Sequence, residues 1–302
     1  MSTIKPSISK GTRDFSPAVL SKRNYLKTQL ISAFESYGFQ PIETPSFERS
    51  ETLLGKYGEE GDRLIFKILN SGDKVKKADL EAFNKGELGK FSDSLSQKAL
   101  RYDLTVPFAR YVSQYQNEII FPFRRYQMQT VWRADRPQHG RFQEFIQCDA
   151  DVVGDRSLWQ EVEGVLLYDR VFSKLNLKGV QIHLNHRKIL AGIAQYIGAE
   201  SQLLNFTVAL DKLSKIGIEG VINELQSKGF PAIAIERLQP FLSLKGDFET
   251  QLSAVAKALK GIKIAQEGIE ELKFIYSKSN RQSLKSLSLV FDVTLARGLN
   301  YY

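Results

Sequence analysis

Cysteine and histidine are scarce in this sequence. Its 302 residues contain one cysteine, Cys148, and three histidines, His139, His183 and His186. A single thiol excludes an intrachain disulfide framework, and the histidines lack the spacing of a zinc site or a catalytic triad. We therefore expect no metal held by protein side chains alone.

Long apolar runs and glycine-rich phosphate loops are also missing. No run approaches the roughly 20 apolar residues that span a bilayer. The first residues lack the basic start, apolar core and cleavage site of a secretion signal. The lack of a Gly-rich phosphate loop argues against a P-loop or a dinucleotide-binding fold. We expect a cytoplasmic protein with no membrane partner.

The composition is that of an ordinary globular protein with an excess of basic residues. It is 42% hydrophobic and 11% aromatic, which is enough for one large core and leaves room for a smaller appended domain. Lysines and arginines number 42 against 34 acidic residues, giving a formal charge of +8. This charge would attract a polyanion, but it fits a merely solvated basic surface equally well.

The N-terminal part of the sequence predicts a helix followed by short extended segments. Ser16 can cap a helix over 17–37, in which Pro17 occupies a position that tolerates a missing N–H. Residues 39–45 contain two prolines, so we expect this strand at a sheet edge or an interface. Another short strand is expected over 64–69.

Residues 73–97 are charge-balanced and show no periodicity, which predicts a mobile excursion. From Ala99 a strand is expected to enter 101–103, after which Thr105 can cap the next helix. This junction places polar side chains at the end of a strand.

The most informative stretch, residues 124–154, predicts two long antiparallel strands with one polar face. Every second side chain shares a face. The polar face carries Gln127, Gln129, Val131 and Arg133 on the first strand, and Gln143, Phe145, Gln147, Asp149 and Asp151 on the second. Charged and amide groups in the middle of a sheet cost free energy unless partnered, so such a face typically lines a polar cavity. Cys148 falls on the opposite face, where we expect a buried, inert thiol.

The second half of the sequence predicts mostly helices. A helix over 157–175 can be capped by Asp155, and a strand is expected over 180–185. Several short helices separated by glycines follow over 187–285, before a final strand over 287–295.

Two segments carry residues suited to charged ligands. Residues 132–145, WRADRPQHGRFQEF, place arginines around the loop between the two long strands, where a guanidinium can hold a phosphate bidentately. The alternative is a surface hairpin with solvated arginines. Asp103 and Thr105 offer acceptors for an ammonium group, which has three donors. Alternatively, both simply cap a helix.

Residues 132–145 resemble motif 2 of the class II aminoacyl-tRNA synthetases, and the whole set of motifs resembles the histidyl-tRNA synthetase family. The resemblance implies that Arg133 is catalytic and holds the α-phosphate of ATP. It implies that Arg141 reaches the γ-phosphate and that Phe145 packs on adenine. The loop residues Arg136 and Gln138 become the candidates for contact with the acceptor end of tRNA.

Other segments resemble the parts of the family that bind the amino-acid substrate. Residues 100–110 resemble the family's amino-acid-binding segment, and residues 145–151 resemble its second binding strand. RGLNYY at 297–302 resembles the histidine-specific signature, with Asn300 in place of the usual aspartate, which removes a charge beside the pocket. Histidine binding is thereby implied for Asp103, Leu104, Thr105, Gln147, Asp151, Arg297, Tyr301 and Tyr302, with a catalytic role for Arg297 as well.

The implied activity is that of a histidine-tRNA ligase, with ATP and Mg²⁺, L-histidine and tRNA(His) as its partners. The segment over 37–45 resembles motif 1, which implies a homodimer. A synthetase-like regulatory subunit of ATP phosphoribosyltransferase is the alternative, but such relatives tend to lose catalytic positions that match here, Arg133, Arg141 and Asp103 among them. An unrelated basic RNA-binding protein is disfavoured because no concentrated Lys/Arg run is present.

The resemblance covers nearly the whole chain and implies a class II synthetase-like α+β fold. Its parts are a largely antiparallel sheet, helices that flank the sheet, and a helical insertion. We expect a catalytic core with motifs 1 and 2 over 1–185, the insertion over 186–286, and a return to the core over 287–302. Family members continue into motif 3, so this chain is expected to stop before it.

Overall fold

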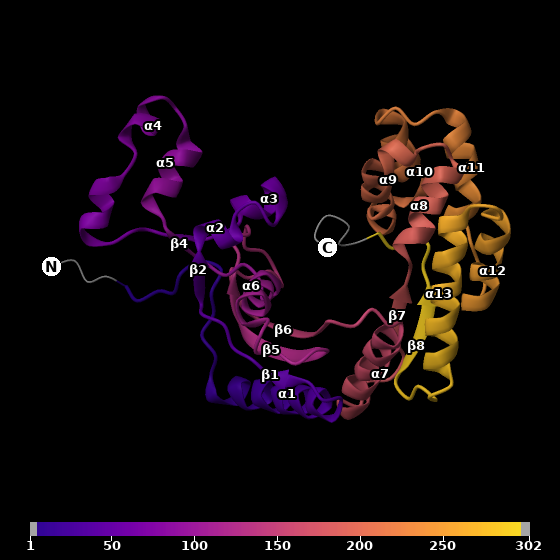
Figure 1. The fold of residues 1–302 in the computed structure, drawn as a ribbon, viewed down its shortest axis with the longest axis horizontal. Helices are drawn as coiled ribbons and strands as arrows, with labels where there is room; N and C mark the ends of the chain where they lie inside the picture. The colour runs from indigo at the N-terminus through magenta and orange to yellow at the C-terminus, as the bar shows by residue number, and fades with distance from the viewer. Residues whose placement is uncertain (1–4, 297–302) are drawn as a thin grey trace. The chain divides into compact units, whose positions relative to one another are not determined.

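The structure, a computed structural model, describes residues 5–296, apart from the side chains of Glu59 and Glu60. Contacts between residues divide the chain into two compact units, and the boundary falls between Asp155 and Arg156 in the sequence (Figure 1). The first unit holds short sheets and the helices around them, and the second is mostly helical. The mixed α+β fold is therefore confirmed.

The main sheet of the first unit has the order β1-β5-β6. β1 (Gln40–Pro41) pairs in parallel with β5 (Phe123–Trp132), which pairs along its whole length with antiparallel β6 (Glu144–Val153). The expected long strand pair is confirmed. Within the described residues the proline-containing segment lies at a sheet edge and pairs over two residues, since proline cannot donate to a ladder.

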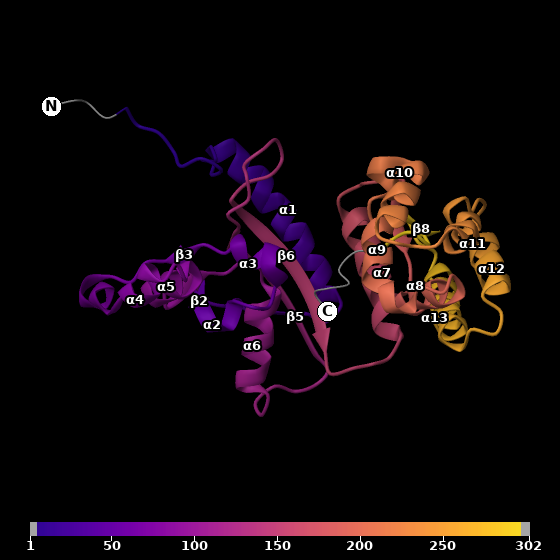
Figure 2. The same cartoon turned by 90° about the horizontal axis from the view of Figure 1, so that it is seen from above.

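Helix α1 (Pro17–Ser36) packs on one face of this sheet (Figure 2). Ser16 caps it as expected, because its Oγ accepts a hydrogen bond from the Val19 N–H at 3.5 Å. Phe34 is buried and its ring lies 5.5 Å from that of Tyr126 on β5. The helix thus covers the face opposite the polar one.

A second, smaller antiparallel sheet has the order β2-β4-β3, from Phe47–Arg49, Lys98–Leu100 and Lys67–Ile68. Around it lie α2 (Ser50–Leu53), α3 (Gly58–Arg63) and α6 (Thr105–Tyr115). Thr105 was expected to cap α6, and that prediction is wrong. Leu104 occupies the N-cap position, and Asp103 Oδ1 accepts a hydrogen bond from the Val106 N–H at 3.3 Å.

Residues 73–97, expected to form a mobile excursion, contain regular secondary structure. This stretch folds into η1 (Gly72–Lys77), α4 (Leu80–Asn84) and α5 (Leu88–Leu95), which project beyond the small sheet (Figure 1). Asp79 caps α4 through the Ala82 N–H, and the rings of Phe83 and Phe91 pack at 4.9 Å. These helices are too short to produce a visible periodicity.

The second unit surrounds a parallel strand pair with helices. β7 (Val180–Leu184) pairs with β8 (Leu287–Phe291). The helices are α7 (Trp159–Lys174), α8 (Arg187–Tyr196), η2 (Glu200–Gln202), α9 (Leu203–Leu210), α10 (Leu213–Ser227), α11 (Ala232–Leu242), α12 (Phe248–Ala258) and α13 (Lys263–Asn280). Asp155 was expected to cap α7, but Leu158 occupies the N-cap position, and Ser157 Oγ accepts a hydrogen bond from the Trp159 N–H at 3.3 Å.

The helices of the second unit share one core, formed by side chains such as Ile189, Phe206, Leu225 and Ile269. The compact unit that holds these helices begins at Arg156 and therefore includes α7 and β7. The expected boundary between catalytic core and insertion after residue 185 concerns the family's domains and stays a prediction. None of the helices within residues 5–296 combines the length and apolarity that crossing a bilayer requires.

Candidate active site

A cavity of about 620 Å³ opens in the first unit beside the polar end of β5 and β6. It is lined by Arg13, Tyr57, Gly61, Leu64, Tyr102, Arg133, Asp135, Gly140, Arg141, Phe142 and Phe145. The lining includes three arginines, Arg13, Arg133 and Arg141, and one carboxylate, Asp135. Such a cavity suits an anionic ligand that also has a flat apolar part.

Arg133 joins three segments that are far apart in the sequence. Its Nε donates to the Tyr102 carbonyl at 3.1 Å, and its Nη2 donates to Gln147 Oε1 at 3.3 Å. Its guanidinium carbon lies 4.3 Å from the centre of the Tyr102 ring and 5.3 Å from that of Phe145. The guanidinium is therefore held in place beside the aromatic side chain predicted to pack on adenine.

The loop between β5 and β6 closes in a tight turn. The backbone groups of Gln138 and Arg141 exchange two hydrogen bonds, and Gly140 adopts φ +77°. Arg141 lines the cavity, stays 58% exposed, and approaches Asp135 at 3.6 Å. Arg136 and Gln138 are exposed. The structure thus places Arg141 on the cavity wall and leaves Arg136 and Gln138 to solvent.

Asp103 is 4% exposed and its carboxylate is held by two donors. The Tyr57 hydroxyl donates to Oδ1 at 2.8 Å, and the Val106 N–H donates to the same oxygen. Burial raises the pKa of Asp103, and the hydrogen bonds from Tyr57 and Val106 and the charge of Arg133 oppose that rise. Asp103 therefore caps α6 through Oδ1, and ammonium binding through its other oxygen stays a prediction that this capping does not exclude.

The other residues of this segment differ in accessibility. Thr105 is half-buried, and within the described residues its hydroxyl makes no hydrogen bond. Leu104 is 0% exposed, so its side chain belongs to the core and only its backbone could meet a ligand.

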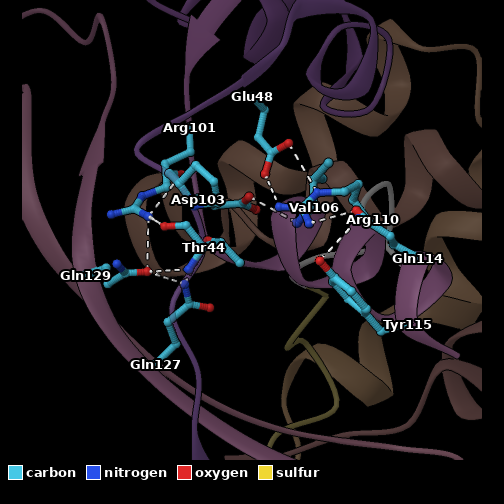
Figure 3. Close-up of polar contacts among 11 residues, drawn as sticks. Thr44, Glu48, Arg101, Asp103, Val106, Arg110, Gln114, Tyr115, Gln127 and Gln129 are labelled. Atoms are coloured by element: carbon cyan, nitrogen blue, oxygen red, sulfur yellow. Dashed lines mark hydrogen bonds and ion pairs between the residues drawn. The ribbon is translucent and has the colours of Figure 1, made fainter. Parts of the chain in front are cut away.

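A buried arginine beneath the site fixes the segment that carries Asp103 (Figure 3). Arg101 is 2% exposed and donates to the carbonyls of Thr44 and Thr130 and to Gln129 Oε1, at 2.6, 2.7 and 3.1 Å. Burial lowers the pKa of Arg101. The partners of Arg101 are on β5 and on the segment after β1. Arg101 therefore fixes the segment that carries Tyr102 and Asp103 to the main sheet.

The polar face of β5 and β6 forms a connected row of side chains. Gln147 donates to the carboxylate of Asp149 at 3.1 Å, and Asp149 lies 3.9 Å from Arg125. Arg125 is 0% exposed and forms an ion pair with Asp151 at 2.6 Å. Burial raises the pKa values of both carboxyl groups, and the charge of Arg125 opposes that rise.

Sequence reasoning missed Arg125, Tyr57 and Arg101. Arg125 could have been found, because it lies two residues before Gln127 and shares its face. Tyr57 left no signal, since it meets Asp103 across 46 residues of sequence.

Cys148 departs from expectation in its exposure. It lies on the face opposite Gln147 as predicted, but it is exposed rather than buried. β6 is an edge of the described sheet, so no strand covers its outer side. Partial desolvation still raises the pKa of Cys148 to about 11, which keeps the thiol protonated near neutral pH.

The signature residues Arg297, Asn300, Tyr301 and Tyr302 lie outside the described residues. The chain just before them is held by Asn185, whose side-chain amide donates to the carbonyls of Val293 and Leu295 at 3.0 and 2.9 Å.

Solved structures place the fold among the aminoacyl-tRNA synthetases. Histidyl-tRNA synthetase from Nostoc sp. PCC 7120 superposes with a TM-score of 0.80 at 29% identity, over 99% of this chain and 64% of that one. An ATP phosphoribosyltransferase regulatory subunit/histidyl-tRNA synthetase from Bacillus halodurans has a TM-score of 0.79 at 21% identity, over 99% of this chain and 72% of that one, and so shares the fold. The fold is thus that of the catalytic part of a class II synthetase.

Sequence comparison identifies the family. A family model described as histidyl-tRNA synthetase matches residues 11–78 and 78–302. The histidine–tRNA ligase of Christiangramia forsetii is 60% identical and that of Porphyromonas gingivalis 51% identical, each over 99% of this chain. The chain belongs to the histidyl-tRNA synthetase family. It spans 65% of the length of these two relatives.

Proposed function

We propose that the full-length protein is a histidine-tRNA ligase. It would activate L-histidine with ATP to give histidyl-adenylate and pyrophosphate, and then transfer the histidyl group to tRNA(His). The observation that carries this proposal is the position of Arg133, which hydrogen-bonds both the Tyr102 carbonyl next to Asp103 and the side chain of Gln147. Nucleotide-binding and amino-acid-binding residues thereby share one site.

The activation step needs no protein nucleophile. The histidine carboxylate attacks the α-phosphorus of ATP, and pyrophosphate leaves. Arg133 would stabilise the charge that develops on the α-phosphate, while Arg141 binds the γ-phosphate and Phe145 packs on adenine. The role of Arg297 at the carboxylate and α-phosphate rests on the resemblance of the signature segment.

The amino acid would be held at both ends. Asp103 and Thr105 accept hydrogen bonds from its α-ammonium group. Gln147 and Asp151 contact the amino acid, and Asp151 faces its imidazole ring. Backbone atoms of Leu104 complete the ammonium side. Tyr301 and Tyr302 are assigned to histidine binding by the signature alone, with Tyr302 at the side chain.

Mg²⁺ would enter with ATP. Among the described side chains that line the cavity, Asp135 is the one carboxylate, and no trio of metal-ligating side chains is grouped within residues 5–296. Mg²⁺ is commonly held by substrate phosphates and one or two carboxylates, and Asp135 fits that role. When bound, the ion neutralises phosphate charge.

The partner of the assembled enzyme would be a second copy of the chain, in the cytoplasm. Apolar side chains lie exposed beside β1, including Ile120 at 87% and Phe121 at 43% exposure. They border a groove of about 600 Å³ lined by Tyr111, Tyr115 and Phe123 among others. Light scattering of the full-length protein measures its molar mass. A mass equal to that of one chain at micromolar concentration would contradict the dimer.

Histidine-dependent exchange of labelled pyrophosphate into ATP by the full-length protein tests the proposed activity. The regulatory-subunit alternative predicts histidine binding without exchange. Exchange that depends on another amino acid would contradict the substrate assignment.

Replacing Tyr57 by Phe tests the ammonium site. The change removes one of two hydrogen bonds to Asp103 Oδ1, so we expect the histidine KM in the exchange assay to rise about three- to tenfold. The hydrogen bond from Tyr57 lowers the pKa of Asp103, so its loss raises that pKa. Ammonium binding needs the ionised carboxylate, and it is lost as pH falls through this pKa.

The pH profile of histidine KM therefore separates this role from a purely structural one. In the Tyr57→Phe variant the acidic limb should move to higher pH, while the ATP KM stays within about twofold. A uniform loss of kcat at every pH, without movement of the limb, would contradict the role of Tyr57.

A further inference from the structure

Residues 5–34 hold most of the excess positive charge of the chain. They contain six lysines and arginines against one acidic residue, Asp14, so a net +5 of the formal +8 lies in 30 of 302 residues. Within the part of the chain that the structure describes, no carboxylate forms an ion pair with any of these six cations. Unpaired cations on one segment create a positive potential that attracts a polyanion.

This basic segment is docked onto the start of β6, next to the cavity. The Gln143 N–H donates to the Gly11 carbonyl at 2.8 Å. Gly11 adopts φ +83°, and a Cβ added to it would lie 2.7 Å from Gln143 Cγ. Only glycine allows this conformation and close approach without strain. Arg13, two residues after Gly11, is thus held at the candidate active site.

Two of the cations are fixed by stacking on aromatic rings. The guanidinium carbon of Arg13 lies 3.4 Å from the centre of the Phe142 ring and 5.1 Å from that of Phe15. That of Arg23, on α1, lies 4.0 Å from the Phe15 ring. Stacking covers the faces of a guanidinium and leaves its N–H edges free. Arg13 and Arg23 are therefore preorganised donors that make no hydrogen bond to the described residues.

The cations continue outward from the cavity in a row. Arg13 lines the cavity of about 620 Å³, whereas Arg23 and Lys27 line an adjoining cavity of about 160 Å³. Phe145 lines both cavities, so they meet at the start of β6, the smaller one on the side of the strand pair that α1 covers and the larger one on the polar side. The row therefore reaches past the site of a single nucleotide. In the proposed function Arg133 and Arg141 bind the phosphates of ATP. Arg13, Arg23 and Lys27 remain, and a ligand with several phosphate groups in a chain could bind all three.

We propose that Arg13, Arg23 and Lys27 bind the phosphate backbone of the unpaired 3′ end of the RNA substrate as it enters the cavity. The cavity of about 620 Å³ admits nucleotides of a single strand but no duplex, so the RNA end that reacts must be unpaired. The inference rests on the proposed function. It adds RNA contacts from the N-terminal segment and α1 to those expected from Arg136 and Gln138.

The test uses the full-length protein with Arg23→Ala and Lys27→Ala combined, and Arg13→Ala as a second variant. For the double variant we expect binding of tRNA(His) to weaken about tenfold at low salt, with histidine-dependent exchange within about twofold of the wild type. The slope of log Kd against log salt should fall by about 0.7 for each lost phosphate contact. For Arg13→Ala, we expect tRNA binding to weaken more than exchange does.

Lys22→Ala is the matched control, since it removes one charge from α1 at a position that lines neither cavity. It should bind tRNA nearly as the wild type does. If Lys22→Ala weakens tRNA binding as much as Arg13→Ala does, or as much as the double variant does for each charge removed, the effect is one of overall charge and the inference is overturned. Loss of exchange in proportion to tRNA binding by the double variant would also overturn it, because the cations would then serve the nucleotide or the fold.

A tRNA that lacks its last four nucleotides locates the contact. With this RNA the wild type and the double variant should bind alike, and a persisting tenfold difference would place the contact on the duplex instead. If the wild type binds RNA but shows no histidine-dependent exchange, the proposed function fails, while the comparison of Kd values still decides the inference.

Discussion

Replacing Arg133 by Ala is expected to lower histidyl-adenylate formation by about 10²-fold or more. The guanidinium is held by the Tyr102 carbonyl and Gln147 and lies against the Tyr102 ring, so its position is set before substrate binds. A preorganised group that stabilises developing charge needs no reorganisation in the transition state, and removing one such donor costs roughly 2.7–4 kcal/mol. Pyrophosphate exchange at saturating ATP and histidine measures the loss.

Two variants show whether the loss belongs to the chemistry. Arg133→Lys keeps a charge but loses the fork that bonds two partners, so exchange should recover only in part. Arg136→Ala removes an exposed arginine of the same loop and should leave exchange near the wild-type rate, because that side chain does not line the cavity. A near-normal exchange rate for Arg133→Ala, with unchanged melting temperature, would be incompatible with the proposed site.

The strand pair that carries the site was predictable because its two-residue period persists over ten residues in each strand. The register places Gln129 opposite Gln147 and Gln127 opposite Asp149, so one face collects the polar groups of both strands. Chain alternation alone determines that outcome once the strands pair. Resemblance was still needed to assign these groups to histidine and ATP, because alternation says nothing about the ligand.

Other parts of the structure depend on contacts that local sequence does not encode. The two α-helices within 72–95 are five and eight residues long, and a periodicity needs longer windows. The sequence predicted Arg101 at the end of a strand. Its role as a buried anchor depends on the carbonyls of Thr44 and Thr130, which are 57 and 29 residues away in the sequence. Asp103 and Thr105 were both candidates to cap α6, and residue type alone could not decide between them, because both types are common at helix N-termini. The structure gives the capping hydrogen bond to Asp103.

Replacing Arg125 by Met should destabilise the fold by about 3 kcal/mol near neutral pH. Breaking a buried ion pair by removing one partner costs roughly 3–5 kcal/mol, and we expect the lower end because the Asp151 side chain is 34% exposed. The methionine keeps an apolar stem against Phe108, whose ring lies 4.2 Å from the guanidinium carbon. Urea unfolding at fixed protein concentration measures the change. Arg124→Met, on the same strand and opposite face, should cost less than about 1 kcal/mol.

The origin of this loss is uncompensated negative charge, and two further measurements follow from that. Without Arg125, the pKa values of Asp149 and Asp151 rise further above their unfolded values, because the charge that lowered them is gone. A raised pKa in the folded state gives stability that is present at low pH and lost as pH rises, so the deficit should shrink between about pH 8 and pH 5.5. Adding Asp151→Asn removes one stranded charge, and the double variant should be more stable than Arg125→Met alone. A deficit that stays constant with pH and is not relieved by Asp151→Asn would show that Arg125 acts through packing, since lost contacts with Phe108 respond to neither change.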